Sequence, residues 1–154
     1  MITTQQAILK YGKPNQEGSY LTSIKLPYPM RLAWDKETKV NTMRCHKLAA
    51  EKFTAVFNDI LAHYGYDRIV ELEIDLFGGC FNFRAMRGGS DWSRHSWGIA
   101  VDLSPEKNAL KTKYKDSQFA KPEYAPLHEI FEKHGFINLG KAKGYDSMHW
   151  ELKE

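Results

Sequence analysis

The chain has 154 residues, of which 42% are hydrophobic and 27% are charged, and its net charge is +3. This length predicts one domain over residues 1–154 that buries roughly 70% of its unfolded surface. Because no segment reaches the length of a membrane span and lysines and arginines form no block, neither a membrane protein nor a nucleic-acid-binding protein is expected. The first six residues lack a basic leader and an apolar run, so synthesis in the cytoplasm without a secretory signal is expected.

The N-terminal part of the chain predicts a short helix followed by strands. Thr3 or Thr4 can cap a helix over residues 5–11. Residues 18–34 alternate and contain two prolines, which favours short strands or edge strands.

The main core helix is predicted over residues 45–64, where apolar residues recur at helical spacing before Gly65. His46 and His63 fall on this helix, and a lone helical histidine is more often packed or exposed than a metal ligand. The two cysteines form no Cys-x-x-Cys pair, so we expect Cys45 and Cys80 to be free and buried.

The C-terminal half mixes short strands, helices and glycine turns, which predicts an α+β fold with an antiparallel sheet and flanking helices. Strands are expected at residues 69–77, 80–84, 98–103, 136–139 and 147–152, with a surface loop at 104–122, a helix at 125–134 and a turn at 140–144.

The first segment with candidate chemistry contains His95 and Asp102. Ala100 and Asp102 share one face of the predicted strand, and a carboxylate on an inward face needs a partner. Gly98 lets the chain turn tightly, so that the His95 side chain can approach Asp102. A histidine–aspartate hydrogen bond in a turn and a metal site fit these residues equally well.

A second segment near the C-terminus adds ligands of the same kind. His149 and Glu151 share a face of the last predicted strand, and Asp146 lies in the turn before it. Hydrolytic zinc sites combine three protein ligands with an open position and a nearby carboxylate that accepts a proton. The two segments together can supply all of these groups, although a hydrogen-bonded histidine at a sheet end would leave the same pattern.

The two segments resemble the zinc D-alanyl-D-alanine carboxypeptidases and L-alanyl-D-glutamate endopeptidases, which include small phage endolysins and share a fold with the hedgehog signalling domain. The resemblance covers about residues 40–154 and does not place the first forty. Both family patterns, Ser-x-His-x-x-Gly-x-Ala-x-Asp and Asp-x-x-His, are met in full, at Ser93, His95, Gly98, Ala100, Asp102, Asp146 and His149.

The resemblance implies zinc bound by His95, Asp102 and His149, with Asp146 as the general base. An arginine upstream of the first motif would bind substrate and stabilise the oxyanion. Arg84 matches this position better than Arg87, which stays an alternative because the chain lacks the Gly-Tyr-Arg sequence of many relatives.

Two further polar residues have alternative roles under this resemblance. Ser93 would contact substrate or orient the segment that carries the first histidine. Glu151 would orient His149 as its hydrogen-bond partner or act as a second base.

The resemblance predicts a zinc-dependent peptidase that cleaves peptidoglycan with activated water, as a monomer. A phage endolysin that cuts the L-Ala–D-Glu bond is favoured; it would act from the host cytoplasm on the cell wall in the periplasm after the membrane is permeabilised. A D-Ala-D-Ala carboxypeptidase or dipeptidase is the alternative enzyme, and a non-catalytic zinc-holding wall-binding module is the alternative class.

Other candidate residues favour structural roles. The segment His128–Glu132 falls one histidine short of a His-Glu-x-x-His zinc helix, so an ordinary amphipathic helix is expected there. His134 suits the C-terminus of that helix. Trp92, Trp97 and Trp150 flank the proposed ligands, where core packing is the usual role and a substrate groove the alternative.

Overall fold

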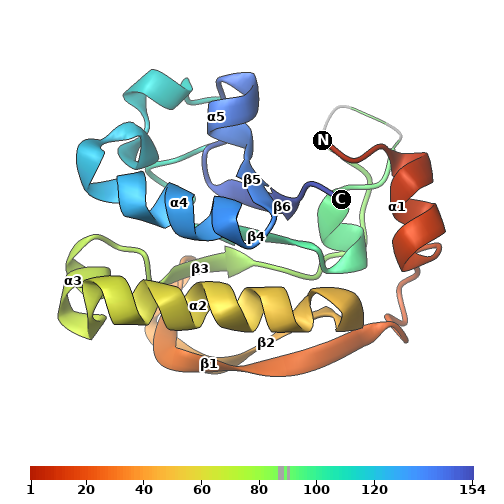
Figure 1. Ribbon diagram of the computed structural model, residues 1–154, viewed down its shortest axis with the longest axis horizontal. Coiled ribbons are helices and arrows are strands. Elements are labelled where there is room, and N and C mark those ends of the chain that lie inside the picture. Colours follow the sequence, from red (N-terminus) through yellow and green to blue (C-terminus); the bar gives the residue numbers. More distant parts are fainter. Residues whose placement is uncertain (87–88, 90) are drawn as a thin grey trace.

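Within the residues that the computed structural model describes, 1–86, 89 and 91–154, a six-stranded sheet has the order β2-β1-β3-β4-β6-β5 (Figure 1). Neighbouring strands are antiparallel except for β1 and β3, which are parallel. The strands are β1 Leu21–Leu32, β2 Asp35–His46, β3 Leu76–Gly79, β4 Ala100–Leu103, β5 Phe136–Asn138 and β6 His149–Leu152. The predicted α+β class is confirmed, and the sheet, predicted to be antiparallel, is antiparallel except for the pair of β1 and β3.

Helices flank this sheet. The two longest, α2 and α4, pack against each other and against strands β1 and β5, respectively (Figure 1). The helices are α1 Thr4–Tyr11, α2 Ala50–Tyr64, α3 Tyr66–Glu71, α4 Ala125–Lys133 and α5 Leu139–Lys143. Short 3-10 turns connect several of these elements, and one of them, Arg94–Trp97, contains His95.

An aromatic core fixes the position of β6. The rings of Phe131 and Trp150 are stacked, with their centroids 4.1 Å apart, and the ring centroids of Phe53 and Phe136 lie 4.8 Å apart. All four side chains are almost fully buried. Because side chains alternate along a strand, anchoring Trp150 in this core directs His149 to the opposite face of β6.

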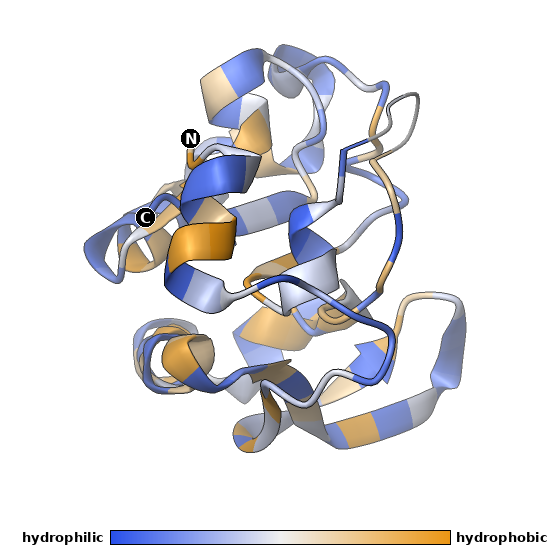
Figure 2. Cartoon of the chain, turned by 90° about the vertical axis from the view of Figure 1, so that its right-hand side faces the viewer, coloured by the Kyte–Doolittle hydropathy of each residue, from blue (hydrophilic) through white to orange (hydrophobic). Residues whose placement is uncertain are grey.

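The first forty residues, which the resemblance does not place, are integrated into the fold. Thr3 caps α1 in a reciprocal capping box with Gln6. Arg94 donates hydrogen bonds to the Ile2 carbonyl oxygen at 2.8 Å and to Thr4 Oγ1 at 3.1 Å. Helix α1 therefore packs beside the turn that carries His95, at the side of the molecule that faces the viewer in Figure 2.

The hairpin of β1 and β2 differs from the prediction. Strand β2 was not predicted, because most of its residues are polar and exposed and show no alternation. Strand β1 is not an edge strand; it pairs with β2 on one side and β3 on the other. Pro27 and Pro29 are accommodated because the register with β2 breaks between Lys25 and Met30.

The secondary structure of three other segments was predicted wrongly. Residues 45–46 end β2, so the core helix begins at Ala50 after a 3-10 turn. Residues 69–75 form the end of α3 and a turn instead of a strand; Ile69 and Leu72 are buried three positions apart, a helical spacing. The predicted turn at 140–144 is largely helix α5, capped by the Asn138 side chain.

The predicted strand at residues 80–84 is irregular backbone instead. Its amides and carbonyls bond to the turn around His95: Asn82 N donates to His95 O, and Ser93 N donates to Arg84 O, both at 3.0 Å. This segment consequently serves as a support for the His95 turn.

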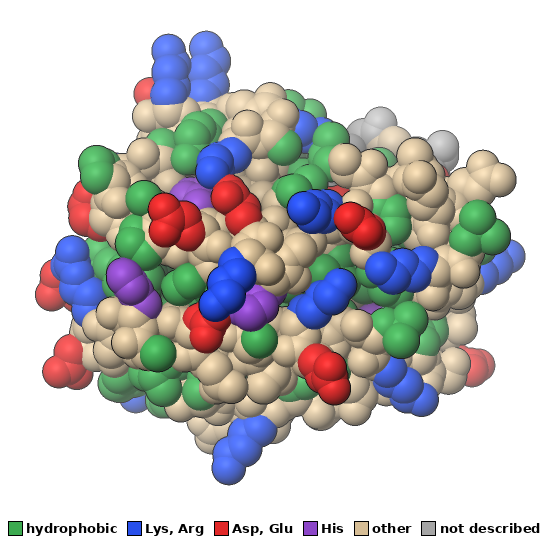
Figure 3. All heavy atoms as spheres, in the orientation of Figure 1, with side chains coloured by type: hydrophobic (Ala, Val, Ile, Leu, Met, Phe, Trp, Pro, Cys, Tyr) green, Lys and Arg blue, Asp and Glu red, His purple; other side chains and the backbone are tan. Residues whose placement is uncertain are grey.

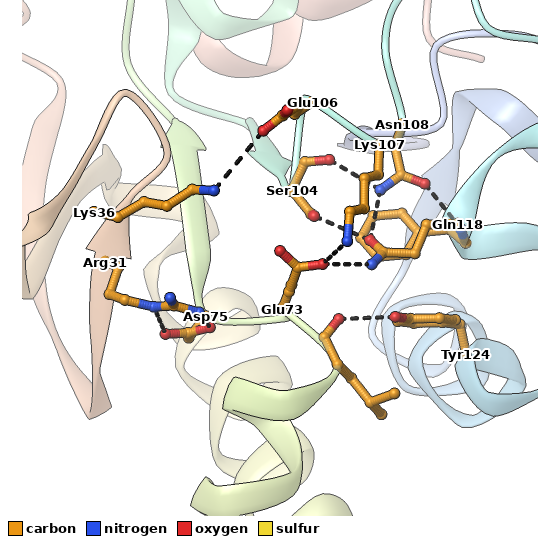
Figure 4. A network of polar contacts seen from close by, with 12 residues as sticks. Arg31, Lys36, Glu73, Asp75, Ser104, Glu106, Lys107, Asn108, Gln118 and Tyr124 are labelled. Carbon is orange, nitrogen blue, oxygen red and sulfur yellow. Dashed lines mark hydrogen bonds and ion pairs between the residues drawn. The ribbon is translucent and has the colours of Figure 1, made fainter.

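A buried polar network anchors the predicted surface loop 104–122 (Figure 4). Asn108 donates to the carbonyl oxygen of Ser104 and to the side chain of Gln118, which itself bonds to Glu73 at 3.1 Å. Lys107 pairs with the same Glu73 carboxylate at 2.5 Å. These contacts hold both ends of the loop against the segment before β3.

Acidic and basic side chains are mixed over the face that α2 and α4 cover (Figure 3). Asp59 on α2 contacts His134 Nε2 at 2.7 Å and Lys133 Nζ at 3.6 Å at the end of α4. Charged side chains on this face thus form contacts between α2 and the end of α4, and they do not form a band of one sign.

Candidate metal centre

Strand pairing brings the predicted ligands together. Asp102 on β4 lies directly opposite His149 on antiparallel β6. The turn before β4 adds His95, and the candidate ligand atoms of all three residues lie within 4.8 Å of one another. Asp102 is partly exposed and both histidines are buried.

The ring of His95 is oriented by backbone groups. Its Nδ1 lies 2.7 Å from the carbonyl oxygen of Cys80, so Nδ1 carries the proton and Nε2 carries the lone pair. Nε2 lies 3.2 Å from Asp102 Oδ2. The Ser93 hydroxyl accepts a 3.3 Å hydrogen bond from the His95 amide and caps this turn.

In the ring of His149 the roles of the two nitrogens are exchanged relative to His95: Nε2 is bound by an orienting group and Nδ1 faces the cluster. Nε2 lies 2.9 Å from Glu151 Oε1, so Nε2–H donates to this buried carboxylate. Nδ1 faces Asp102 Oδ1 at 3.2 Å, and the rings of His149 and His95 are perpendicular with centroids 4.8 Å apart. Glu151 therefore occupies the place of an orienting partner, the first of its two proposed roles.

The unsatisfied atoms of the cluster fit a bound cation. Among the residues that the structure describes, His95 Nε2 and Asp102 Oδ1 are buried without a hydrogen-bond partner, although each lies 3.2 Å from another atom of the cluster. Buried polar atoms are normally satisfied, so simple histidine–aspartate hydrogen bonding does not explain this arrangement. Two imidazole nitrogens and one carboxylate are a donor set that zinc prefers.

Electrostatics in the cluster also favour a cation. Burial raises the pKa of Asp102, but the neighbouring His95 and His149 outweigh burial and hold this pKa below its ordinary value. For His149, burial lowers the pKa, but Asp102 and Glu151 together raise it to about 10. The two carboxylates therefore stabilise positive charge between them, whether it is a proton or a metal ion.

Asp146 lies in the turn that leads into β6. Its φ of 66° is in the left-handed region, which aspartate tolerates better than most residues. Its carbonyl oxygen accepts a 3.2 Å hydrogen bond from the His149 amide. Burial raises the pKa of Asp146 and Asp102 adds to this effect, against the opposing charges of His149 and His95. A raised pKa suits a group that accepts and returns a proton.

The cluster lines a cavity of about 540 Å³. Among the predicted site residues, Arg84, Ser93, Asp146 and Glu151 line the same cavity. Ser93 is 4% exposed and bonds to the His95 amide, which fits the orienting role better than direct substrate contact. Arg87 lies outside the described residues, so the choice between the two arginines rests on Arg84 lining the cavity.

Several contributors to the site were missed in the sequence. The carbonyl of Cys80 orients His95, and a backbone acceptor leaves no signature in side-chain patterns. Gly78 leaves room for Asp102, because a Cβ there would lie 2.9 Å from the Asp102 Cβ. Gly78 and Gly79 lie between two of the predicted strands, but the sequence does not show that Asp102 lies next to Gly78 across the sheet.

The remaining candidates have structural roles. His46 and His128 are buried and bond to backbone groups of Tyr11 and Phe119, respectively, and neither joins the cluster. Trp97 and Trp150 are fully buried, which confirms core packing for both. Cys45 and Cys80 are free and buried, as predicted.

Fold and site together define a class: an α+β fold with a candidate metal site of two imidazoles and a carboxylate, and a further carboxylate, Asp146, on the wall of the same cavity. Residues 87–152 match the family model described as D-alanyl-D-alanine carboxypeptidase. The match spans all three candidate ligands and Asp146, and it supports a metallopeptidase of this type. No curated protein and no solved structure matches the chain.

Loss of a ligand should abolish metal binding. We expect His149→Ala protein to elute from gel filtration without the metal that the wild-type protein carries, because two ligands do not hold zinc tightly. The matched control is His63→Ala, which removes an exposed histidine on α2. Equal metal content in the His149→Ala and wild-type proteins, measured by elemental analysis, would contradict the ligand assignment.

Neutralising the partner of His149 should weaken the site without removing a ligand. We expect Glu151→Gln to lower zinc affinity by about 10- to 100-fold, because the amide oxygen still accepts the His149 proton but carries no charge. Competition with a chromophoric chelator measures this change. Glu129→Gln, an exposed change on α4, is the control, and unchanged affinity in Glu151→Gln would exclude an electrostatic role.

Proposed function

We propose that the protein is a zinc-dependent peptidoglycan peptidase of the endolysin type that cleaves the L-Ala–D-Glu bond of the stem peptide. The observation that carries this proposal is the cluster of His95, Asp102 and His149, with two buried ligand atoms that have no hydrogen-bond partner among the described residues, at a cavity that Asp146 also lines. The family match over residues 87–152 supports a peptidase that acts on peptidoglycan.

His95 Nε2, Asp102 and His149 Nδ1 would hold the zinc ion. Bound there, zinc supplies the Lewis acidity that peptide hydrolysis requires at neutral pH. The protein fixes these donors beforehand, since Cys80 and Glu151 hold the two rings in the correct tautomers. Little reorganisation is therefore needed when the ion binds.

Asp146 performs the proton transfers in this mechanism. Its carboxylate takes a proton from the attacking water and returns it to the leaving amine. The Arg84 guanidinium, on the wall of the same cavity, stabilises the negative charge that develops on the carbonyl oxygen. No side chain needs to form a covalent bond with the substrate.

The enzyme would act on the cell wall of the host from the inside. A phage lysis enzyme of this kind accumulates in the host cytoplasm as a monomer and reaches the cell wall after a separate protein permeabilises the membrane. Within the described residues, no helix combines the length and the apolar character needed to cross a bilayer.

A D-Ala-D-Ala carboxypeptidase is the second candidate, and the description of the matching family favours it. That reaction would place the terminal carboxylate of the substrate in the same cavity, where Arg84 or Lys143 can meet it. The two reactions release different products from the same polymer.

Product analysis tests the proposed bond. We expect digestion of purified sacculi to expose new amino groups on D-Glu, found by mass spectrometry, and to stop after chelation until zinc is restored. Release of free D-Ala without new D-Glu amines would identify the carboxypeptidase instead. Metal-loaded protein that releases neither product would contradict both enzymes and favour a wall-binding module.

Removing the base should separate catalysis from metal binding. We expect Asp146→Asn to retain zinc but to lose about 100- to 10,000-fold of its activity, because an amide cannot accept the proton. Wall lysis is followed by turbidity and zinc by elemental analysis. Asp67→Asn, an exposed change in α3, is the control. Full activity in Asp146→Asn would exclude this residue as the base.

A further inference from the structure

A second hollow, of about 890 Å³, adjoins the cavity of the metal centre. Leu110 and Tyr145 line both spaces, so a chain bound at the metal centre can continue into the second one. We refer to this second hollow as the lysine groove. Its other principal side chains are those of Lys111, Lys113, Lys115 and Tyr114.

The charge of the lysine groove is uncompensated. Lys111, Lys113 and Lys115 are exposed, and none forms an ion pair with a carboxylate in the part of the chain that the structure describes. Lys143, on the wall of the metal cavity, lies over the Tyr145 ring at 5.6 Å from its centroid. Among the described residues, the groove is lined by no acidic side chain. The surface therefore fits an anionic ligand with some apolar contact area.

Backbone contacts tie the lysine groove to the strand of the metal centre. Tyr114 N donates to Gly144 O at 2.7 Å, and Lys113 forms a β-bridge with Tyr145. At the base of the loop, Met148 N donates to the Asn108 carbonyl oxygen at 2.9 Å, immediately before His149. The same Asn108 belongs to the anchored network of Figure 4. The groove is thus formed before any ligand arrives, at a fixed distance from the metal centre.

We propose that the lysine groove binds side-chain carboxylates of the peptide that is cleaved at the metal centre. This inference rests on the proposed function, since stem peptides of peptidoglycan carry free carboxylates close to their scissile bonds. The lysines supply long, mobile cations that adapt to carboxylates along the peptide, and the tyrosine rings cover its apolar part. The groove then determines which peptides are cleaved, without taking part in the bond cleavage.

The test compares two synthetic stem peptides that differ only in charge. One carries free side-chain carboxylates, the other carries carboxamides in their place, and both keep the same C-terminus. Because each exposed charge pair changes binding only a few-fold, we expect the wild-type protein to prefer the acidic peptide by about tenfold in kcat/KM, mostly through KM. This preference should decline as the salt concentration rises.

The variant Lys111→Gln/Lys113→Gln should lose this preference. Its control is Lys25→Gln/Lys39→Gln, which makes the same change in net charge on the hairpin of β1 and β2 and should keep the preference. Thermal unfolding of each protein checks that the fold is retained. A groove variant that still prefers the acidic peptide, or a wild-type protein that cleaves both peptides equally, would overturn the inference.

Other outcomes distinguish this inference from the proposed function. If the wild-type protein cleaves neither peptide, the proposed function fails and the inference falls with it. If the groove variant loses activity on intact sacculi but keeps its preference between the free peptides, the groove binds another polyanion of the wall and the inference is wrong.

Discussion

The pairing of β4 with β6 is the constraint on which the site depends. It sets Asp102 opposite His149 on one face of the sheet, while Trp150 on the other face is held by the aromatic core. A slip of one residue in this register would turn His149 into the core and Trp150 toward the cavity. The packing of Trp150 against Phe131 therefore stabilises the fold and also holds the candidate ligands in place.

The site was more predictable than the fold around it. His95, Asp102 and His149 occur in two short patterns whose residue types and spacing point to one chemistry, and the structure brings them together. Glu151 was visible because alternation along a strand puts it on the same face as His149. The metal itself and the roles of Asp146 and Arg84 stay predictions.

The errors in the fold have specific physical causes. Strand β2 is stabilised by pairing along one side, and its exposed polar residues leave no periodic signal. Apolar and acidic residues alternate over residues 71–76 as they do in a strand, although residues 69–71 form the end of helix α3 and 72–75 a turn. Other contributions come from the backbone, such as the Cys80 carbonyl behind His95, and no pattern of side chains reveals them.

The two histidines face the candidate metal position with different ring nitrogens, and this difference determines which replacements each can tolerate. His95 presents its distal Nε2 from a turn, whereas His149 presents the proximal Nδ1 from a strand. The oxygen of a glutamate or glutamine side chain lies about as far from the backbone as the Nε2 of His95. The oxygen of the shorter aspartate or asparagine matches the Nδ1 of His149. If these substitutes were exchanged between the two positions, one side chain would be too short to reach the candidate metal position and the other too long, although the residue composition of the site would be the same.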